Sequence, residues 1–164
     1  MAYGSGNFSG EEWTDTVTLA SDLVIKDQSI GVASSATGFD GIDGILGIGP
    51  VDLTSGTVSN MDTVPTVSDN LRSQGTISEE VLGIYYAPAS ESSSTGKLTF
   101  GGYDKSVITS SVKYVPLTAT SPASEYWGID QSISYDGATI LSTTAGIVDT
   151  GTTLILIASG ERHD

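Results

Sequence analysis

The sequence lacks cysteine and has few basic side chains. Without cysteine it can form no disulfide, no thiolate nucleophile and no thiolate metal site. The cysteine content therefore does not indicate whether the protein works in an oxidising or a reducing compartment. Six Lys and Arg stand against twenty Asp and Glu, a net charge of −14. Because nucleic acids and anionic membranes attract basic surfaces, this balance excludes both as expected partners. No apolar run has membrane-spanning length, and no signal peptide precedes the first predicted strand, so the leader of a secreted parent is expected to be absent here.

The residues that are present follow a β pattern. Alternating or mostly apolar runs are separated by clusters of Gly, Ser, Asp and Pro, which are typical of turns. These runs predict strands at 12–20, 22–35, 79–87, 96–102, 111–118 and 126–141. Asp136-Gly137 lies between apolar residues and predicts a tight hairpin turn.

One segment follows a helical period instead. Val64, Val67 and Leu71 recur at helical spacing, with Thr63 as the expected N-cap and Gly75 as the expected end. A polar loop is expected at 87–96. We therefore predict an all-β fold with one short helix. A chain of 164 residues that folds alone should bury roughly 70% of its unfolded surface.

The segment that points to chemistry is Asp149-Thr150-Gly151. A lone Asp-Thr-Gly is a common turn sequence, because Asp caps its own backbone and Gly accepts positive φ. Here it follows the apolar run 145–148, predicted to be a buried strand, and hydroxyl groups surround it at Thr150, Thr152 and Thr153. Such donors would orient the carboxylate and favour its ionised form.

Two further features accompany this triplet. Near the start, "YGSGNFSGEEWTDTVTL" has an aromatic residue, two glycines in alternate positions and then a long strand, as a flexible hairpin would. In the middle, Ile45-Leu46-Gly47 follows an Asp-Gly turn, and its glycine would let another backbone approach closely. Each feature alone is weak.

Taken in this order, residues 3–159 resemble the pepsin-like aspartic proteases, most closely the basidiomycete fungal members of that family. The matching stretches are "YGSG", "ILGIG", "LTFGGYDKSVITSSVKYVPL", "YWGI" and "IVDTGTT". The resemblance implies an all-β, pepsin-like bilobal fold, truncated at both ends. Residues 1–111 would form the rear part of the N-terminal lobe, and 112–164 an interlobe strand with the front part of the C-terminal lobe.

The resemblance also implies roles for particular residues. Asp149 matches the second catalytic aspartate, and Thr150 the threonine that joins the two catalytic loops. Residues that would contact substrate are Tyr3, Gly4, Ser5 and Gly6, which form the flap that closes over a bound peptide, together with Gly151 and Thr152. Ile45, Leu46 and Gly47 would support the first catalytic loop. The family implies neither a cofactor nor a metal.

The departures from the family pattern carry expectations of their own. The sequence holds a single Asp-Thr-Gly, whereas the family uses a pair of aspartates that activates a water molecule for acid proteolysis. The first aspartate is expected to precede Tyr3, and the rest of the C-terminal lobe to follow residue 159. We expect the parent to be an extracellular aspartic endopeptidase acting on proteins or peptides, and the isolated chain to be inactive. Self-association through exposed sheet edges is also expected.

Three alternatives remain open at this point. A one-aspartate chain can form a homodimeric protease in which two Asp149 loops face each other. A pepsin-like chain can instead be a non-catalytic binding or inhibitor protein. The composition also fits an unrelated secreted β-sandwich lectin, although that reading leaves the ordered motifs to chance.

Overall fold

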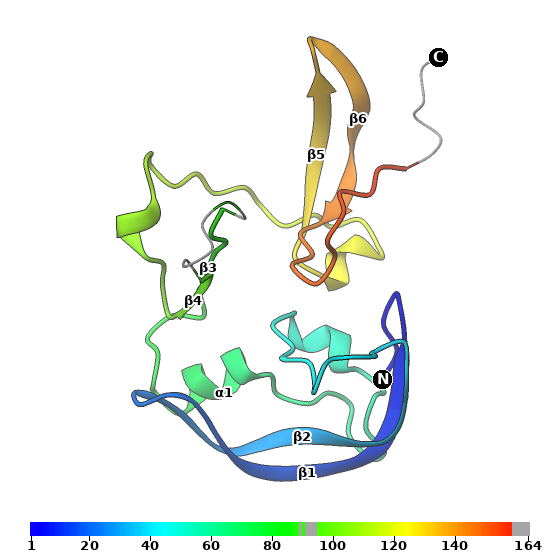
Figure 1. Ribbon diagram of the computed structural model, residues 1–164, viewed down its shortest axis with the longest axis vertical. Helices are drawn as coiled ribbons and strands as arrows, with labels where there is room; N and C mark the ends of the chain where they lie inside the picture. Colours follow the sequence, from blue (N-terminus) through cyan, green and yellow to red (C-terminus); the bar gives the residue numbers. More distant parts are fainter. Residues whose placement is uncertain (89, 91–94, 159–164) are drawn as a thin grey trace. The chain divides into compact units, whose positions relative to one another are not determined.

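The structure is a computed structural model that describes residues 1–88, 90 and 95–158 (Figure 1). The chain divides into two compact units, Met1–Val112 and Lys113–Asp164. In the described residues, the regular structure consists of three two-stranded antiparallel sheets, one α-helix and three short 3₁₀ helices. The expectation of a β-rich chain with one short helix is confirmed.

The first unit is built on a long hairpin of strands β1 (Asn7–Ala20) and β2 (Leu23–Thr37). Their register pairs Asn7 with Thr37 and Trp13 with Ile30. The pairing shifts between Ser9 and Gly10, where the Cβ of any larger residue at position 10 would collide with the Val32 carbonyl. Such irregularities bend and twist a hairpin locally.

Helix α1 (Val67–Ser73) covers part of this hairpin and forms the main core of the unit. Buried Val67 and Leu71 pack against Ile25 of β2 and against Ile77. Partly buried apolar side chains surround this cluster, namely those of Leu19, Leu23 and Phe100. The helical spacing of Val67 and Leu71 thus reflects a core-facing stripe.

The predicted start of this helix is wrong by three residues. The N-cap is Thr66, whose side chain accepts from the Asp69 N–H while the Asp69 carboxylate accepts from the Thr66 N–H. Pro65 explains the shift, because a proline disfavours helical backbone in the residue before it and so excludes Val64 from the helix. Gly75, with φ +75°, lies just past the C-cap Gln74, as expected of the residue that ends the helix.

The rest of the first unit is a short hairpin with connecting turns. It contains the 3₁₀ helix η1 (Val51–Thr54), strands β3 (Leu82–Tyr85) and β4 (Lys97–Phe100), and the 3₁₀ helix η2 (Lys105–Val107). Residues 42–50 have no helix or strand. The loop predicted at 87–96 connects β3 and β4, and its residues 89 and 91–94 lie outside the described residues.

The second unit is organised by the hairpin of β5 (Gly128–Tyr135) and β6 (Ala138–Ile147). Asp136 and Gly137 both have positive φ, 48° and 78°, which confirms the predicted tight turn. At the other end of the hairpin, the 3₁₀ helix η3 (Ala123–Glu125) lies so close to Gly128 that a Cβ there would collide with the Ala123 carbonyl. Thr118, which is buried, donates its hydroxyl to Asp130 at 2.7 Å.

Two strand expectations in this region are wrong. Residues 111–118 form no strand, and Tyr114 and Leu117 are 79% and 59% exposed. Pro116 removes one backbone donor, and no strand of the described chain pairs with this segment. The run 145–148 is not a buried strand either, because Val148 is 56% exposed and, among the strands that the structure describes, β6 pairs with β5 alone.

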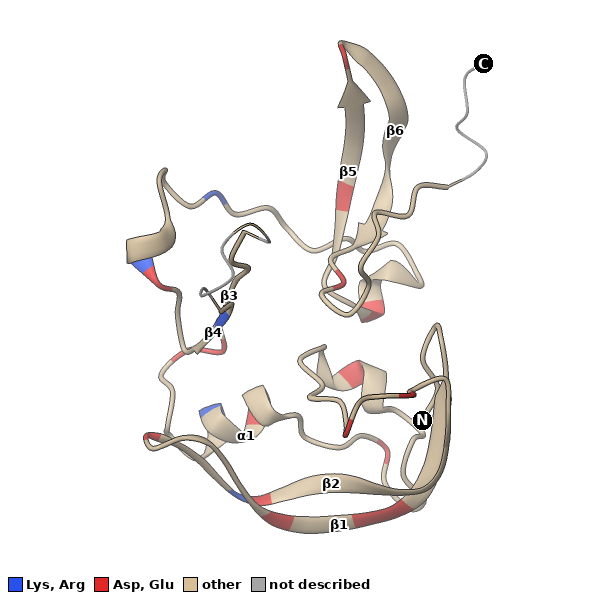
Figure 2. Cartoon of the chain, viewed as in Figure 1, with Lys and Arg blue, Asp and Glu red and all other residues tan. Residues whose placement is uncertain are grey.

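Acidic side chains are spread along both units (Figure 2). They lie along β1, in η1 and at the tip of the β5–β6 hairpin, whereas the basic residues are few and scattered. The negative charge is therefore spread over many segments of the chain.

Candidate active-site residues

Asp149 lies just beyond the end of β6. The Val148 N–H donates to the Trp127 carbonyl at 2.9 Å, which continues the β5–β6 ladder by one step before the chain turns away. In that turn, Asp149 Oδ1 accepts the Gly151 N–H at 2.8 Å and Oδ2 accepts the Thr152 hydroxyl at 2.5 Å. Each carboxylate oxygen therefore has its own donor, and the orientation of the group is fixed.

These two donors set the electrostatics of the carboxylate. The Thr152 hydroxyl and then the Gly151 N–H lower the pKa of Asp149 below its ordinary value, because both stabilise the charged form. Asp149, Thr150 and Gly151 are all exposed in this chain. The arrangement is an oriented, ionised carboxylate that is open to an incoming molecule, which suits proton transfer or activation of a water molecule.

The predicted flap forms a hairpin at the start of the chain. The Tyr3 N–H donates to the Gly6 carbonyl at 2.7 Å, and Ala2 pairs with Asn7. Met1 and Phe8 exchange two further bonds, at 2.8 and 2.9 Å, through the N-terminal ammonium and the Phe8 N–H. The four predicted flap residues thus form one turn, closed by backbone bonds at its base.

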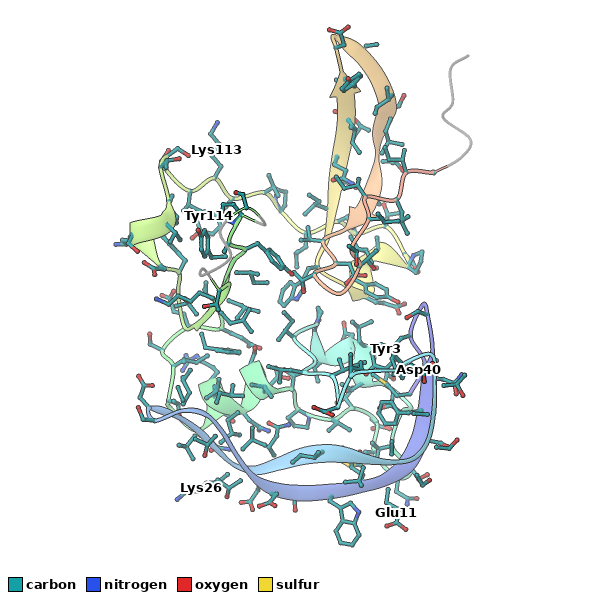
Figure 3. All side chains as sticks on the ribbon, viewed as in Figure 1. Tyr3, Glu11, Lys26, Asp40, Lys113 and Tyr114 are labelled. Atoms are coloured by element: carbon teal, nitrogen blue, oxygen red, sulfur yellow. The ribbon has the colours of Figure 1, made fainter. Side chains whose placement is uncertain are left out.

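Tyr3 lies against two other aromatic rings (Figure 3). Its ring centroid is 6.3 Å from that of Phe8 in a stacked arrangement and 5.5 Å from that of Phe39 in an edge-to-face arrangement. Partial burial raises the pKa of the Tyr3 phenol.

The segment Ile45-Leu46-Gly47 has no regular structure. Ile45 and Leu46 are 48% and 43% exposed, and no atom beyond the adjacent residues lies within 4 Å of a Cβ placed on Gly47. Among the described residues, the Cβ side of that glycine is therefore open. Unit 1 therefore holds the flap and this segment, whereas unit 2 holds the Asp149 turn.

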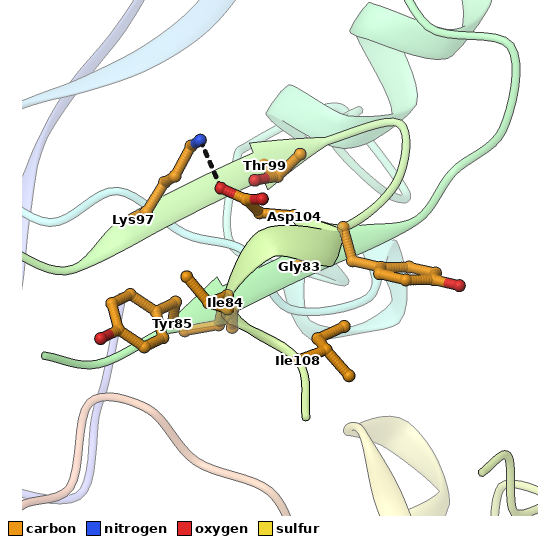
Figure 4. A pocket seen from close by; sticks show the side chains of 9 residues that line it. Gly83, Ile84, Tyr85, Lys97, Thr99, Asp104 and Ile108 are labelled. Carbon is orange, nitrogen blue, oxygen red and sulfur yellow. Dashed lines mark hydrogen bonds and ion pairs between the residues drawn. The ribbon is translucent and has the colours of Figure 1, made fainter. Parts of the chain in front are cut away.

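One feature that the sequence did not single out is a shallow pocket of about 150 Å³ between β3, β4 and η2 (Figure 4). Lys97 Nζ is 2.7 Å from Asp104 Oδ2 at its edge. The Lys97 contact, followed by bonds from Ser106, holds the pKa of Asp104 well below its usual range. In the strand predicted at 96–102, Lys97 and Thr99 are two residues apart and so lie on one face. This was the sequence signal available for the pocket, which both residues line. The ammonium and the carboxylate at its edge are paired with each other.

Two other kinds of site were sought in the described ranges. No set of three or more His, Cys, Asp or Glu residues there is grouped closely enough to hold a metal ion. No helix in those ranges has the length and apolar content needed to cross a bilayer.

The sequence of residues 1–163 matches the family model described as "Eukaryotic aspartyl protease". The chain belongs to this family of aspartic proteases. The family predicted from the flap, the Ile-Leu-Gly segment and the Asp-Thr-Gly turn is therefore confirmed.

Individual relatives agree with this assignment. The chain is 63% identical over 163 residues to polyporopepsin of Irpex lacteus, covering 97% of this chain and 48% of that protein. It is 38% identical over 162 residues to rhizopuspepsin-1 of Rhizopus niveus, covering 96% of this chain and 39% of that protein. The chain thus spans about half or less of the length of the curated relatives it matches.

The fold also agrees with an experimental structure. The crystal structure of the aspartic proteinase from Irpex lacteus superposes with a TM-score of 0.93 at 61% sequence identity, covering 98% of this chain and 48% of that chain. The predicted pepsin-like fold is confirmed over the part of it that this chain spans.

Proposed function

We propose that this chain is the central part of an extracellular acid endopeptidase in which Asp149 is one of two catalytic carboxylates. The observation that carries the proposal is the bonding of Asp149, whose two oxygens accept from Gly151 and Thr152. Membership of the aspartyl protease family supplies the reaction class. The strongly acidic composition suits a protein that works outside the cell at low pH.

The reaction requires a second carboxylate. Two neighbouring carboxyl groups cannot both ionise, so one stays protonated while the other is charged. Asp149, held ionised by its two donors, would accept a proton from a water molecule, while the protonated partner would polarise the peptide carbonyl. This chain has one Asp-Thr-Gly, so the partner would come from another part of a longer polypeptide.

The neighbouring residues would bind the extended peptide. The Gly151 N–H and the Thr152 hydroxyl hydrogen are already donated to Asp149. Their contribution to substrate binding would therefore come through oxygen acceptors, the Gly151 carbonyl and the Thr152 hydroxyl oxygen, which suit substrate N–H groups. The flap at residues 3–6 would cover the bound peptide and exclude water.

The two units would correspond to parts of two lobes. Residues 1–111 would form the rear of the N-terminal lobe, and 112–164 the interlobe strand with the front of the C-terminal lobe. Ile45, Leu46 and Gly47 would support the aspartate loop of the first lobe, which fits the open space on the Cβ side of Gly47. Thr150 would join the two catalytic loops.

The proposal is tested by replacing the matching half of polyporopepsin with this chain. We expect the hybrid to digest protein at acidic pH and to be blocked by pepstatin, and the chain alone to be inactive. Asp149→Asn in the hybrid should lower the rate by about 10⁴-fold or more, because residues of one catalytic set act as a unit. Digestion of casein at acidic pH measures the activity of the hybrid, of the chain alone and of the Asp149→Asn hybrid.

Asp136→Asn is the matched control, because Asp136 is an aspartate of the same unit in a turn that Asn also tolerates. It should leave activity unchanged. Full pepstatin-sensitive activity in the Asp149→Asn hybrid would show that Asp149 is not catalytic. Acid protease activity of the chain alone that is lost with Asp149→Asn would instead establish the homodimeric alternative. A folded hybrid that binds peptide without cleaving it would favour the non-catalytic one.

A further inference from the structure

The segment that follows β2 lies directly against the flap turn. Gly6 and Gly38 are so close to the opposite segment that a Cβ on Gly6 would collide with the Thr37 carbonyl, and one on Gly38 with the Ser5 carbonyl. Gly38 also has φ +84°, a conformation that favours glycine. The backbone at the end of β2 can therefore pass beside Ser5 and Gly6 only because Gly6 and Gly38 lack side chains.

This close approach of the two backbones places Phe39 against Tyr3. Phe39 is half-buried, its ring tip lies beside Gly6, and its ring meets that of Tyr3 edge-to-face at 5.5 Å and 88°. An edge-to-face pair is attractive because the positive edge of one ring meets the negative face of the other.

Phe8 supports Tyr3 from a second direction. Its ring stacks with Tyr3 at 6.3 Å and 25°. Behind it, the Phe8 ring lies over Gly31 of β2, where a Cβ would come within 3.1 Å of the ring. Phe8 is thus held by the β1–β2 hairpin, and Phe39 by the turn at Gly38, so the Tyr3 ring has two independently held neighbours.

We propose that Phe39 is a positioning residue of the flap, which fixes the Tyr3 ring through their edge-to-face contact and so sets how the flap meets a bound peptide. The inference rests on the proposed function for its catalytic consequence, but the contact itself is a property of this chain. Phe39 acts through Tyr3 and is assigned no contact with the reacting atoms. Loss of the contact should leave the chemistry at Asp149 intact and weaken peptide binding.

The contact is tested first without any activity, by NMR of the 164-residue chain. Phe39→Leu keeps an apolar side chain but removes the ring, so the Tyr3 ring resonances should move towards their unfolded-chain positions. Phe100→Leu is the matched control, because Phe100 packs at the edge of the core around α1, whereas the ring contacts of Tyr3 in the described residues are with Phe8 and Phe39. It should lower stability and leave the Tyr3 resonances unchanged.

A backbone variant gives a second test in the same chain. Gly38→Ala should displace residues 37–39 from Ser5 and move the Tyr3 resonances in the same direction as Phe39→Leu. Gly44→Ala is its control, because a Cβ on Gly44 meets nothing within 4 Å. Tyr3 resonances that Phe39→Leu leaves in place, or that already lie at unfolded-chain values in the parent chain, would overturn the proposal whatever the hybrid does.

The consequence for binding is tested in the polyporopepsin hybrid. Phe39→Leu should raise KM by about two- to ten-fold, the range expected for loss of one aromatic pair. The value of kcat and the pH profile should be retained, because the carboxylate is untouched. In a Tyr3→Ala background, Phe39→Leu should have no further effect on KM, since coupled residues are not additive. Additive effects, or loss of kcat with KM unchanged, would refute the positioning role even with the NMR contact in place.

Discussion

At the scale of single residues, the pKa of Asp149 depends most on the hydroxyl three residues later. Thr152 is the largest cause of the lowered Asp149 pKa. We therefore expect Thr152→Val to raise the pKa of Asp149 towards its ordinary value, as measured by NMR titration of its carboxyl carbon. Thr153→Val is the matched control and should leave that pKa in place. An unchanged Asp149 pKa in the Thr152→Val chain would contradict the hydrogen bond.

The lowered pKa of Asp149 also determines how this group changes the stability of the fold with pH. A carboxyl group whose folded pKa lies below its unfolded value stabilises the fold above the unfolded pKa, and this contribution is lost as the pH falls through the folded pKa. The bond to Thr152 therefore helps least at the acidic end of the range where an acid protease works. Asp149 is also largely exposed, so the contribution is small after solvent screening.

At the scale of elements, helix α1 shows how a cap sets a boundary. Thr66 and Asp69 form a reciprocal pair of bonds at its N-terminus. We expect Thr66→Ala to lower the free energy of unfolding by about 0.5–2 kcal/mol, the range for loss of an N-cap. Thr63→Ala, at the cap position expected from the sequence, should be close to neutral. Urea unfolding followed by circular dichroism compares the two, and a larger loss for Thr63→Ala would restore the sequence-based boundary.

At the scale of the whole molecule, the chain exposes more surface than its size requires. Its accessible area is 12,074 Å², whereas a compact protein of 16.9 kDa exposes about 7,700 Å² and its unfolded chain about 24,500 Å². It therefore buries about half of its unfolded surface, and not the roughly 70% expected from length alone. Much of the exposed area is apolar, including Leu154, Ile155 and Leu156, which are 71%, 87% and 78% exposed.

This exposure predicts self-association of the isolated chain. Apolar surface and unpaired strand edges favour pairing with another copy, while the net charge of −14 opposes it at neutral pH. The repulsion weakens near the pI of about 4.1, so association should increase there. Sedimentation of the chain at pH 7 and pH 4 measures this, and Ile155→Lys should reduce it more than the matched Thr143→Lys on exposed β6. A monodisperse monomer at both pH values would contradict it.

The sequence by itself determined what depends on neighbouring residues. Local pattern accounts for the hairpin turn at Asp136-Gly137, the core-facing stripe of Val67 and Leu71 and the hydroxyl donor that Thr152 gives Asp149. The family also followed from the order of the motifs along the chain.

Only the tertiary structure decided which segments have neighbours distant in sequence and which segments stay exposed. Residues 111–118 have strand-forming character, but the pairings of the described strands include none of them. The Thr118 N–H donates to the Gly128 carbonyl of β5, and no ladder continues from that bond. The apolar run before Asp149 is exposed because a single neighbouring strand cannot bury it. Phe39 gave no sequence signal for its role, because its contact with Tyr3 depends on the pairing of β1 with β2 and on two glycines 32 residues apart. Hydrogen-bonded pairing and close approach between remote segments are properties of the folded chain, and no local pattern specifies them.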